Sequence, residues 1–289
     1  MTEFLTTDEG RIAYDVSGAG PLVVLSHGMG DTRGAYRALA AELVAAGYRV
    51  ATVDLRGSGE SSATWGSYSR TDTAGDLLAV VRELGGPAVL VGHSFSGGSV
   101  AIAAARAPEL VSAIVQLDPF TRAQKIAVGS LFTNRRYRTG ALRLLGTGLF
   151  GSLGMWSRYL DHAYPGAKPA GYAEHLAEIL ANLREPGRMA AMKKMGFSAP
   201  TDAGAQLPNI GCPALVMMGT LDPDWASPQQ EAEGIVALMP AGRGTLAMIE
   251  GAGHYPHSQY PDRVAQVLLP FLKEHAGEQH AAGEGRTGA

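Results

Sequence analysis

Three residue types suited to nucleophilic catalysis stand in short turns that follow apolar runs. Ser94 ends the run AVLVGHS, Asp222 follows ALVMMGT, and His254 follows TLAMIEG. A serine hydroxyl is nucleophilic near neutral pH only when a base takes its proton, and an imidazole base needs a carboxylate to fix its tautomer. The spacing therefore predicts a Ser–His–Asp triad for acyl transfer, with His254 as the base.

The residues around Ser94 are small, as a sharp turn from strand to helix requires. Gly92 lies two residues before Ser94, and Ser96 lies two residues after it. Such a turn is strained, and it lifts the serine side chain clear of the sheet. We expect Ser96 and Ser99 to pack on the following helix. The alternative is a glycine-rich turn that merely joins a strand to a helix.

A second turn, SHGMG, ends an earlier apolar run and predicts an oxyanion site. Its glycines let the backbone N–H of Met29 point toward the serine. The N–H of Phe95, directly after Ser94, supplies a second donor at a helix start, where negative charge is favoured. A plain turn is the alternative here too.

The elements that must position these residues alternate between strand and helix patterns. Most of the strand candidates are continuous apolar runs, which are typical of strands covered on both faces. This alternation predicts a doubly wound α/β sheet, with the ligand site at the carboxyl ends of the strands. The expected strands are 11–17, 21–27, 48–54, 88–94, 113–118, 214–220 and 245–251, and the expected helices are 35–46, 72–84, 95–107, 226–239 and 261–275.

One interval, 119–208, breaks this rhythm with helical patterning and no clear strand, so we expect a helical cap between core segments 1–118 and 209–276. The interval carries 12 Lys/Arg and 5 Asp/Glu, a net charge of +7, whereas the rest of the chain carries 12 and 22, a net charge of −10. A basic cap on an acidic body is the simpler interpretation. The alternative is that the basic segment TNRRYRTG (133–140) helps to attract an anionic substrate.

Composition narrows the function classes. The 289 residues carry a net charge of −3, which gives no reason to expect nucleic acid or a membrane as a partner. The single cysteine, Cys212, excludes an internal disulfide and favours a reducing cytoplasm, and its place before a strand predicts a structural thiol. The start has no basic-then-apolar leader, and we expect 277–289 to be a disordered tail.

The motifs HGMG, VDLRGSGESS, GHSFSGG, GTLDPDW and GAGHYPH together resemble the α/β-hydrolase superfamily, over nearly the whole chain. The resemblance implies an eight-stranded, mostly parallel sheet with a helical cap inserted after the sixth strand, which matches 119–208. One position departs from the family pattern G-x-S-x-G, because Ser96 stands where the last glycine is usual. This departure weakens the argument from strain.

The resemblance places the acid at Asp222, after the seventh strand. Asp224, two residues on, and Asp118, where some relatives carry the acid, are the alternatives. We expect Asp54 to anchor its own loop through backbone hydrogen bonds.

The other histidines are expected to serve the structure. His27 and His93 stand beside the two key turns as structural hydrogen-bonding groups, and His257 is expected to turn away. No His/Cys/Asp grouping has metal-ligand spacing, so we expect no metal, and acyl transfer needs no cofactor. The apolar segment LLGTGLFGSLGMW suggests a substrate pocket in the cap. The candidate substrate contacts are His27, Leu149, Phe150, Trp156 and Tyr255.

These features predict a serine hydrolase that cleaves a carboxylic ester of a small, largely apolar substrate through an acyl-enzyme. A serine at position 94 argues against an epoxide hydrolase or dehalogenase of this fold, where a carboxylate must form the ester intermediate. Cleavage of a carbon–carbon bond, lactone, thioester or amide by the same triad stays open, as does a non-catalytic ligand-binding protein on this scaffold. The oligomeric state is also left open.

Overall fold

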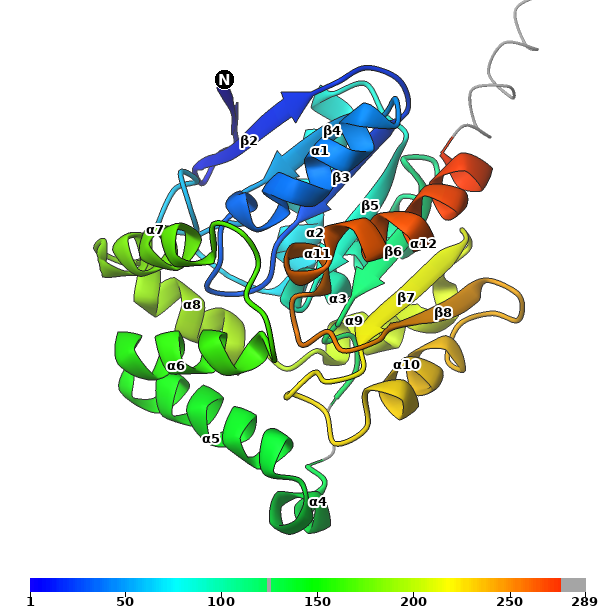
Figure 1. The fold of residues 1–289 in the computed structure, drawn as a ribbon. Helices are drawn as coiled ribbons and strands as arrows, with labels where there is room; N and C mark the ends of the chain where they lie inside the picture. Colours follow the sequence, from blue (N-terminus) through cyan, green and yellow to red (C-terminus); the bar gives the residue numbers. More distant parts are fainter. Residues whose placement is uncertain (124–125, 277–289) are drawn as a thin grey trace, which may run out of the picture.

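The computed structural model describes residues 1–123 and 126–276, and a twisted sheet lies at its centre (Figure 1). The strands run in the spatial order β1-β2-β4-β3-β5-β6-β7-β8. The pairs β1–β2 and β2–β4 are antiparallel, and every pair from β4 to β8 is parallel. Their bounds are β1 Thr2–Thr6, β2 Arg11–Ser17, β3 Leu22–Ser26, β4 Arg49–Val53, β5 Ala88–His93, β6 Val111–Leu117, β7 Ala214–Gly219 and β8 Gly244–Ile249.

This sheet confirms the predicted doubly wound, mostly parallel architecture. Each of the seven strands expected from the apolar runs is present within about two residues of its predicted bounds. The resemblance implied an eighth strand but the apolar runs did not locate it, because β1 is a short edge strand whose side chains are mostly exposed and form no apolar run.

Helices cover both faces of the sheet because its side chains point alternately to the two sides. Val23 and Leu25 of β3 enter one apolar cluster, whereas Leu22 and Val24 enter the other. The first cluster is closed by α1 Arg37–Ala45, which follows the short turn η1 Arg33–Tyr36, and by α12 Pro261–His275 with α11 Pro256–Gln259 beside it. The second is closed by α2 Arg70–Glu83, α3 Phe95–Arg106 and α10 Pro228–Val236.

The described part of the interval between β6 and β7 contains helices and connecting loops but no strand, and we call residues 119–208 the helical insert. Its helices α4 to α8 gather at one end of the sheet (Figure 1). The bounds are α4 Val128–Thr133, α5 Arg135–Phe150, α6 Leu153–Ala163, α7 Tyr172–Arg184, α8 Arg188–Phe197, α9 Thr201–Gln206 and η2 Leu207–Asn209.

The insert supplies most of a third apolar cluster around Trp156, Tyr159 and Leu183, which Tyr255 of the body joins. Its last helix, α9, already packs against α2 and α3 of the body. The domain limits at 118 and 208 therefore stay an interpretation of the sequence, and the predicted tail, 277–289, lies outside the described residues.

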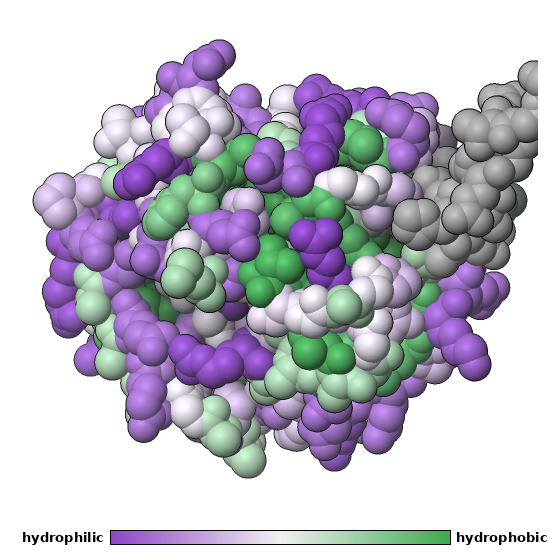
Figure 2. Space-filling model, turned by 90° about the horizontal axis from the view of Figure 1, so that it is seen from above, coloured by the Kyte–Doolittle hydropathy of each residue, from purple (hydrophilic) through white to green (hydrophobic). Residues whose placement is uncertain are grey.

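The face turned away from α4 and α5 is largely hydrophilic, with apolar side chains gathered in smaller groups (Figure 2). On α5, by contrast, Leu142, Leu145 and Leu149 recur at helical spacing and are all more than half exposed. Among the described helices, none has the length and apolar character needed to cross a membrane.

Candidate active site

Ser94 occupies the sharp turn between β5 and α3, with φ 53° and ψ −113°. This backbone conformation is rare for a residue other than glycine, so the surrounding packing must enforce it. A Cβ at Gly92 would lie 2.4 Å from the carbonyl oxygen of Ser96, which shows how closely the chain approaches itself. The strained turn that the sequence predicts is therefore present.

Ser96 does more than fill the place of the usual glycine. Its buried hydroxyl accepts a hydrogen bond from the N–H of His93 at 2.9 Å and donates to the carbonyl oxygen of Ser26 at 2.7 Å. Ser26 ends the neighbouring strand β3. The hydroxyl thus ties the turn to the strand that precedes the second turn, and Ser96 is a hydrogen-bonding residue rather than only a packing one.

Ser94, His254 and Asp222 form one hydrogen-bonded chain. Ser94 Oγ lies 2.9 Å from His254 Nε2, and His254 Nδ1 lies 2.9 Å from Asp222 Oδ2. All three side chains are buried. This geometry has the hydroxyl donating to Nε2 and the Nδ1–H donating to the carboxylate, which is the tautomer that general-base catalysis by Nε2 requires.

Two hydrogen bonds hold the backbone of His254 in place. The N–H of His254 donates to the carbonyl oxygen of Ala163 at 3.0 Å, so α6 of the helical insert supports this loop directly. The Nε2–H of His93 donates to the carbonyl oxygen of His254 at 2.7 Å. Burial, with the neighbouring His257 and His254, holds the pKa of His93 well below its usual range, so His93 is a neutral structural group.

Three carboxyl groups surround His254, but they are not equivalent. Asp224 Oδ2 lies 3.5 Å from His254 Nδ1 and accepts a hydrogen bond from the Tyr159 hydroxyl at 2.7 Å. Asp118 accepts the Gly219 N–H at 2.9 Å. Asp222 therefore makes the shortest contact with the ring.

The pKa values separate these groups further. Burial alone would lower the pKa of His254, but the Asp222 and Asp224 carboxylates outweigh it and raise the pKa to about 9. Burial, reinforced by the Asp222 charge, raises the pKa of Asp224 to about 7 and that of Asp118 well above its usual range. Burial thus favours the protonated form of Asp118, and Asp222 is the carboxylate that hydrogen-bonds the ring directly.

The two predicted oxyanion donors border the same space. A Cβ at Gly28 would lie 2.9 Å from Ser94 Cβ, so the turn with Met29 packs directly against the serine. Met29 and Phe95 both line the cavity described below. Phe95 is the first residue of α3 and has no acceptor within that helix, and no hydrogen bond from the Met29 N–H is found in the described part of the chain.

A cavity of about 260 Å³ opens over Ser94 and His254, between the sheet and the helical insert. Its volume is just below the usual range for ligand pockets. Trp156 and Tyr255, two of the predicted substrate contacts, line it. The other lining residues are mostly apolar and include Phe120, Leu144, Leu145, Met192, Met195 and Phe197.

The other three predicted substrate contacts lie outside this cavity. Leu149 and Phe150 follow Gly148, which lines the cavity, and the helical turn of about 100° per residue carries them round to solvent. Their side chains are 55% and 77% exposed. His27 is fully buried: its Nδ1–H donates to the carbonyl oxygen of Gly28, and its Nε2 accepts the Leu55 N–H.

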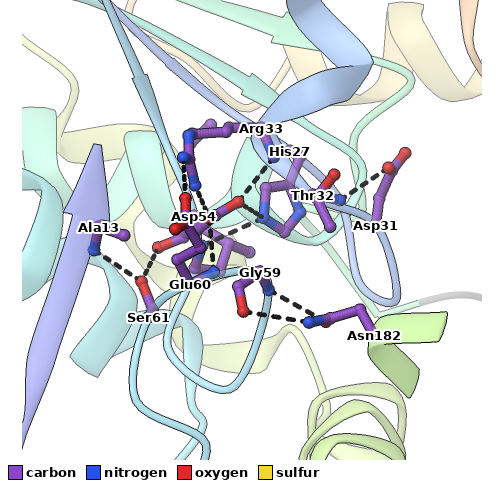
Figure 3. Close-up of polar contacts among 12 residues, drawn as sticks. Ala13, His27, Asp31, Thr32, Arg33, Asp54, Gly59, Glu60, Ser61 and Asn182 are labelled. Carbon is purple, nitrogen blue, oxygen red and sulfur yellow. Dashed lines mark hydrogen bonds and ion pairs between the residues drawn. The ribbon is translucent and has the colours of Figure 1, made fainter. Parts of the chain in front are cut away.

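A polar network joins the loops that follow β3 and β4 (Figure 3). Asp54 accepts the backbone N–H groups of Arg33 at 2.8 Å and Glu60 at 2.9 Å, and it is ion-paired with the Arg33 guanidinium. Asn182 of α7 then bonds both the N–H and the carbonyl oxygen of Gly59, each at 3.1 Å. As expected, Asp54 anchors its loop, and the network also attaches that loop to the helical insert.

The potential ligand atoms of Asp118, Asp222 and His254 lie within 4.8 Å of one another, a grouping that the sequence spacing did not reveal. These groups already engage each other and Gly219 by hydrogen bonds. Their mutual contacts account for the grouping without a metal ion.

Several residues of the site, Tyr159 and Arg70 among them, were not found from the sequence. Tyr159 contacts Asp224 from the insert, and nothing in its local pattern distinguishes it from a core aromatic. Arg70 lines the cavity from the first turn of α2. A cation at the positive end of a helix is unfavourable, and this placement was the available signal.

Comparisons with known proteins agree with this fold. Residues 23–267 match the sequence profile of the Alpha/beta hydrolase family. Among curated proteins, 2-(acetamidomethylene)succinate hydrolase of Mesorhizobium japonicum is 27% identical over 275 residues, which is 92% of this chain and 93% of that protein. An epoxide hydrolase of Caballeronia sordidicola is 37% identical over 107 residues, 36% of this chain and 32% of that protein.

Among solved structures, a thermophilic esterase from Thermogutta terrifontis aligns with a TM-score of 0.73. The alignment covers 95% of this chain and 98% of that one at 24% identity, so it shows a common fold. With the match to the family profile over most of its length, the chain belongs to the alpha/beta hydrolase family.

Proposed function

We propose that this hydrolase cleaves a carboxylic ester of a small, largely apolar substrate by way of an acyl-enzyme on Ser94. The observation that carries the proposal is the pair of 2.9 Å contacts that join Ser94 Oγ, the His254 ring and Asp222. The strained conformation of Ser94 and the small, mostly apolar cavity above it support the same activity.

In the first half-reaction, Ser94 Oγ attacks the ester carbonyl while His254 Nε2 takes the hydroxyl proton. The carbonyl oxygen gains negative charge and accepts hydrogen bonds from the N–H groups of Met29 and Phe95. Asp222 stabilises the imidazolium and keeps its orientation. His254 then gives the proton to the leaving alcohol oxygen, and the acyl group remains on Ser94.

In the second half-reaction, His254 takes a proton from water, and the resulting hydroxide oxygen attacks the acyl carbonyl. The Ser94–acyl bond breaks, and the proton returns from His254 to Ser94 Oγ, releasing the carboxylic acid. Every proton transfer uses the same ring nitrogen, so no further acid or base is required.

The nucleophile separates this proposal from epoxide hydrolysis, the activity named for one relative. An epoxide hydrolase of this fold needs a carboxylate where this chain has Ser94. The relative that matches over 92% of this chain is named as a hydrolase of a succinate derivative, which favours a small acyl compound as the substrate here.

Two measurements test the proposal. A fluorophosphonate probe should label Ser94 in the native protein, as mapped by mass spectrometry, and Ser94→Ala should abolish labelling. Ser94→Ala should also reduce hydrolysis of short 4-nitrophenyl esters by at least about 10³-fold. Unchanged turnover in folded Ser94→Ala protein would remove Ser94 from the mechanism.

A further inference from the structure

Arg70 is a buried cation in the wall of the cavity that contains Ser94. Its side chain is 5% exposed, and it lines the cavity together with Phe95. Nε donates to the carbonyl oxygen of Phe120 at 3.1 Å, and Nη1 donates to the carbonyl oxygen and hydroxyl of Ser198 at 2.9 and 3.0 Å. All of these acceptors are uncharged.

Other buried arginines of this chain are neutralised by a carboxylate. Arg56, which is equally buried, forms two hydrogen bonds with Asp76 at 2.7 and 2.8 Å. Arg188 pairs with Glu185 at 3.2 Å. Within the described residues, Arg70 has no carboxylate oxygen within 4.0 Å, and its Nη2 donates no hydrogen bond.

Burying a guanidinium without a carboxylate partner costs free energy. Removing a guanidinium from water is unfavourable unless an anion or several hydrogen bonds replace the water. Burial lowers the pKa of Arg70 to about 10, against a weak opposing effect of Asp202, whereas the Asp76 carboxylate overcomes burial and raises the pKa of Arg56. Arg70 also stands at the first position of α2, beside the positive end of the helix dipole.

Despite this cost, the structure holds Arg70 firmly in the cavity wall. Its guanidinium lies 4.4 Å from the centre of the Phe95 ring. Its side chain crosses α3 at Gly98, where a Cβ would come within 2.6 Å of Arg70 Cδ. Phe95 is the residue after Ser94, so the cation is held on the element that starts at the nucleophile.

The cavity is lined by charged groups of both signs. Asp224 and His254 lie together, with the Phe120 ring packed 5.9 Å from the His254 ring. Arg70 bonds to the backbone of the same Phe120, and Lys193 of the insert also lines the cavity. The net charge of +7 on the insert adds a favourable field for an incoming anion.

We propose that the acyl part of the substrate ends in a carboxylate and that Arg70 binds this group while Ser94 attacks the ester carbonyl. This inference rests on the proposed ester hydrolysis and names the substrate class: a monoester of a short dicarboxylic acid. The bound carboxylate supplies the anion that none of the described residues places beside Arg70, and the apolar lining contacts the methylene groups between the two ends.

The test compares two activated esters that differ only at the far end of the acyl chain, mono-4-nitrophenyl glutarate and 4-nitrophenyl pentanoate. The readout is the ratio of their kcat/KM values after subtraction of the rate with Ser94→Ala. We expect wild type to prefer the glutarate ester at least tenfold. Arg70→Gln, which keeps a donor but loses the charge, should lower the ratio by roughly 10- to 100-fold.

Two further variants separate recognition from packing. Arg70→Lys keeps the charge and should retain part of the preference, which a merely structural arginine would not predict. Arg82→Gln makes the same charge change on the exposed end of α2 and should leave the ratio at the wild-type value. Equal use of the two esters by wild type, or the same ratio in Arg70→Gln and wild type, would overturn the inference.

A binding measurement keeps this inference distinct from the proposed function. Monomethyl glutarate should bind Ser94→Ala protein more tightly than methyl pentanoate in calorimetry, and Arg70→Gln in that background should abolish the difference. If this difference appears while the fluorophosphonate probe fails to label wild-type Ser94, anion recognition stands and ester hydrolysis falls. If the probe labels Ser94 but monomethyl glutarate and methyl pentanoate bind equally, ester hydrolysis stands and anion recognition falls.

Discussion

Asp224 Oδ2 lies 3.5 Å from His254 Nδ1, the same ring nitrogen that Asp222 Oδ2 approaches to 2.9 Å. One carboxylate makes the hydrogen bond, and the other acts mainly through its charge. Tyr159 holds the second carboxylate in place from the helical insert. The base of the proposed mechanism therefore stands in a more negative environment than a single acid would provide.

The first prediction concerns the pH dependence of the wild-type enzyme. The pKa of His254 is raised to about 9, and the ring can take a proton only when it is neutral. We expect kcat/KM for a neutral ester to rise by roughly 10-fold or more between pH 7 and pH 9. Stopped assays over this range, corrected for spontaneous hydrolysis, measure the rise, and a flat profile would contradict the raised pKa.

Replacing Asp224 by Asn should move this profile to lower pH. Removing a nearby negative charge makes the imidazolium less stable, so the pKa of His254 falls and the neutral base is present at lower pH. The amide can still contact Tyr159. The measurement is the midpoint of the acid limb of kcat/KM, and an unchanged or higher midpoint would show that Asp224 does not act on His254.

Replacing Asp222 by Asn should be far more damaging than replacing Asp118 by Asn. The first change removes the acceptor that fixes the His254 tautomer and should lower kcat by about 10⁴-fold. Burial favours the protonated form of Asp118, so its amide replacement should change the charge of the site little. Steady-state kinetics of both variants decide the assignment, and a larger loss in Asp118→Asn would identify Asp118 as the working acid.

The close approach around the turn predicts a stability loss in Gly92→Ala. The new Cβ would lie 2.4 Å from the Ser96 carbonyl oxygen, a contact that the buried backbone cannot relieve without moving. We expect a loss of about 1–3 kcal/mol or more in the free energy of unfolding, measured by denaturant titration. Gly129→Ala, at a helical position where a Cβ meets nothing within 4 Å, is the matched control.

The buried pair between His175 of α7 and Asp31 should make part of the stability depend on pH. His175 Nε2 lies 2.8 Å from Asp31 Oδ1, with Glu178 3.5 Å from the other ring nitrogen. Burial alone would lower the pKa of His175, but Asp31 and Glu178 raise it above 6.5. The stabilisation by the protonated ring is therefore complete below pH 6.5 and is lost as the pH rises through the folded-state pKa.

His175→Asn should accordingly destabilise the protein by about 3–5 kcal/mol where His175 is protonated, because Asp31 stays buried without its charged partner. The difference in Tm between wild type and His175→Asn should be larger at pH 6 than at pH 9. A difference that grows toward alkaline pH would have the wrong sign for this pair.

The sequence was sufficient for those parts of the molecule that depend on local pattern. Continuous apolar runs located the parallel strands, and the turns at their carboxyl ends located Ser94, Asp222 and His254. Contacts between elements that are distant in the sequence could not be predicted from these local patterns. The orientation of α5 about its own axis decides that Leu144 faces the cavity and Leu149 faces solvent. A segment with apolar residues on all sides of the helix does not reveal this orientation from its sequence.

The role of Arg70 could not be predicted for the same reason, because it depends on contacts between distant elements. Its local pattern, a cation directly after the capping residue Ser69, is unusual, but its importance depends on the lack of a carboxylate partner among residues 1–123 and 126–276. The missing partner is visible only when Phe120 and Ser198, from both ends of the insert, are seen to occupy its other donors.

The backbone bond from His254 to Ala163 and the bond from the Trp156 indole to the carbonyl oxygen of Gly30 attach the insert to two of the loops that carry the reacting groups. Exchanging this insert for that of a homologue would therefore disturb turnover as well as substrate choice. In directed evolution, catalytic power and selectivity should change together in this scaffold, and improvement of one should require compensating changes in the other.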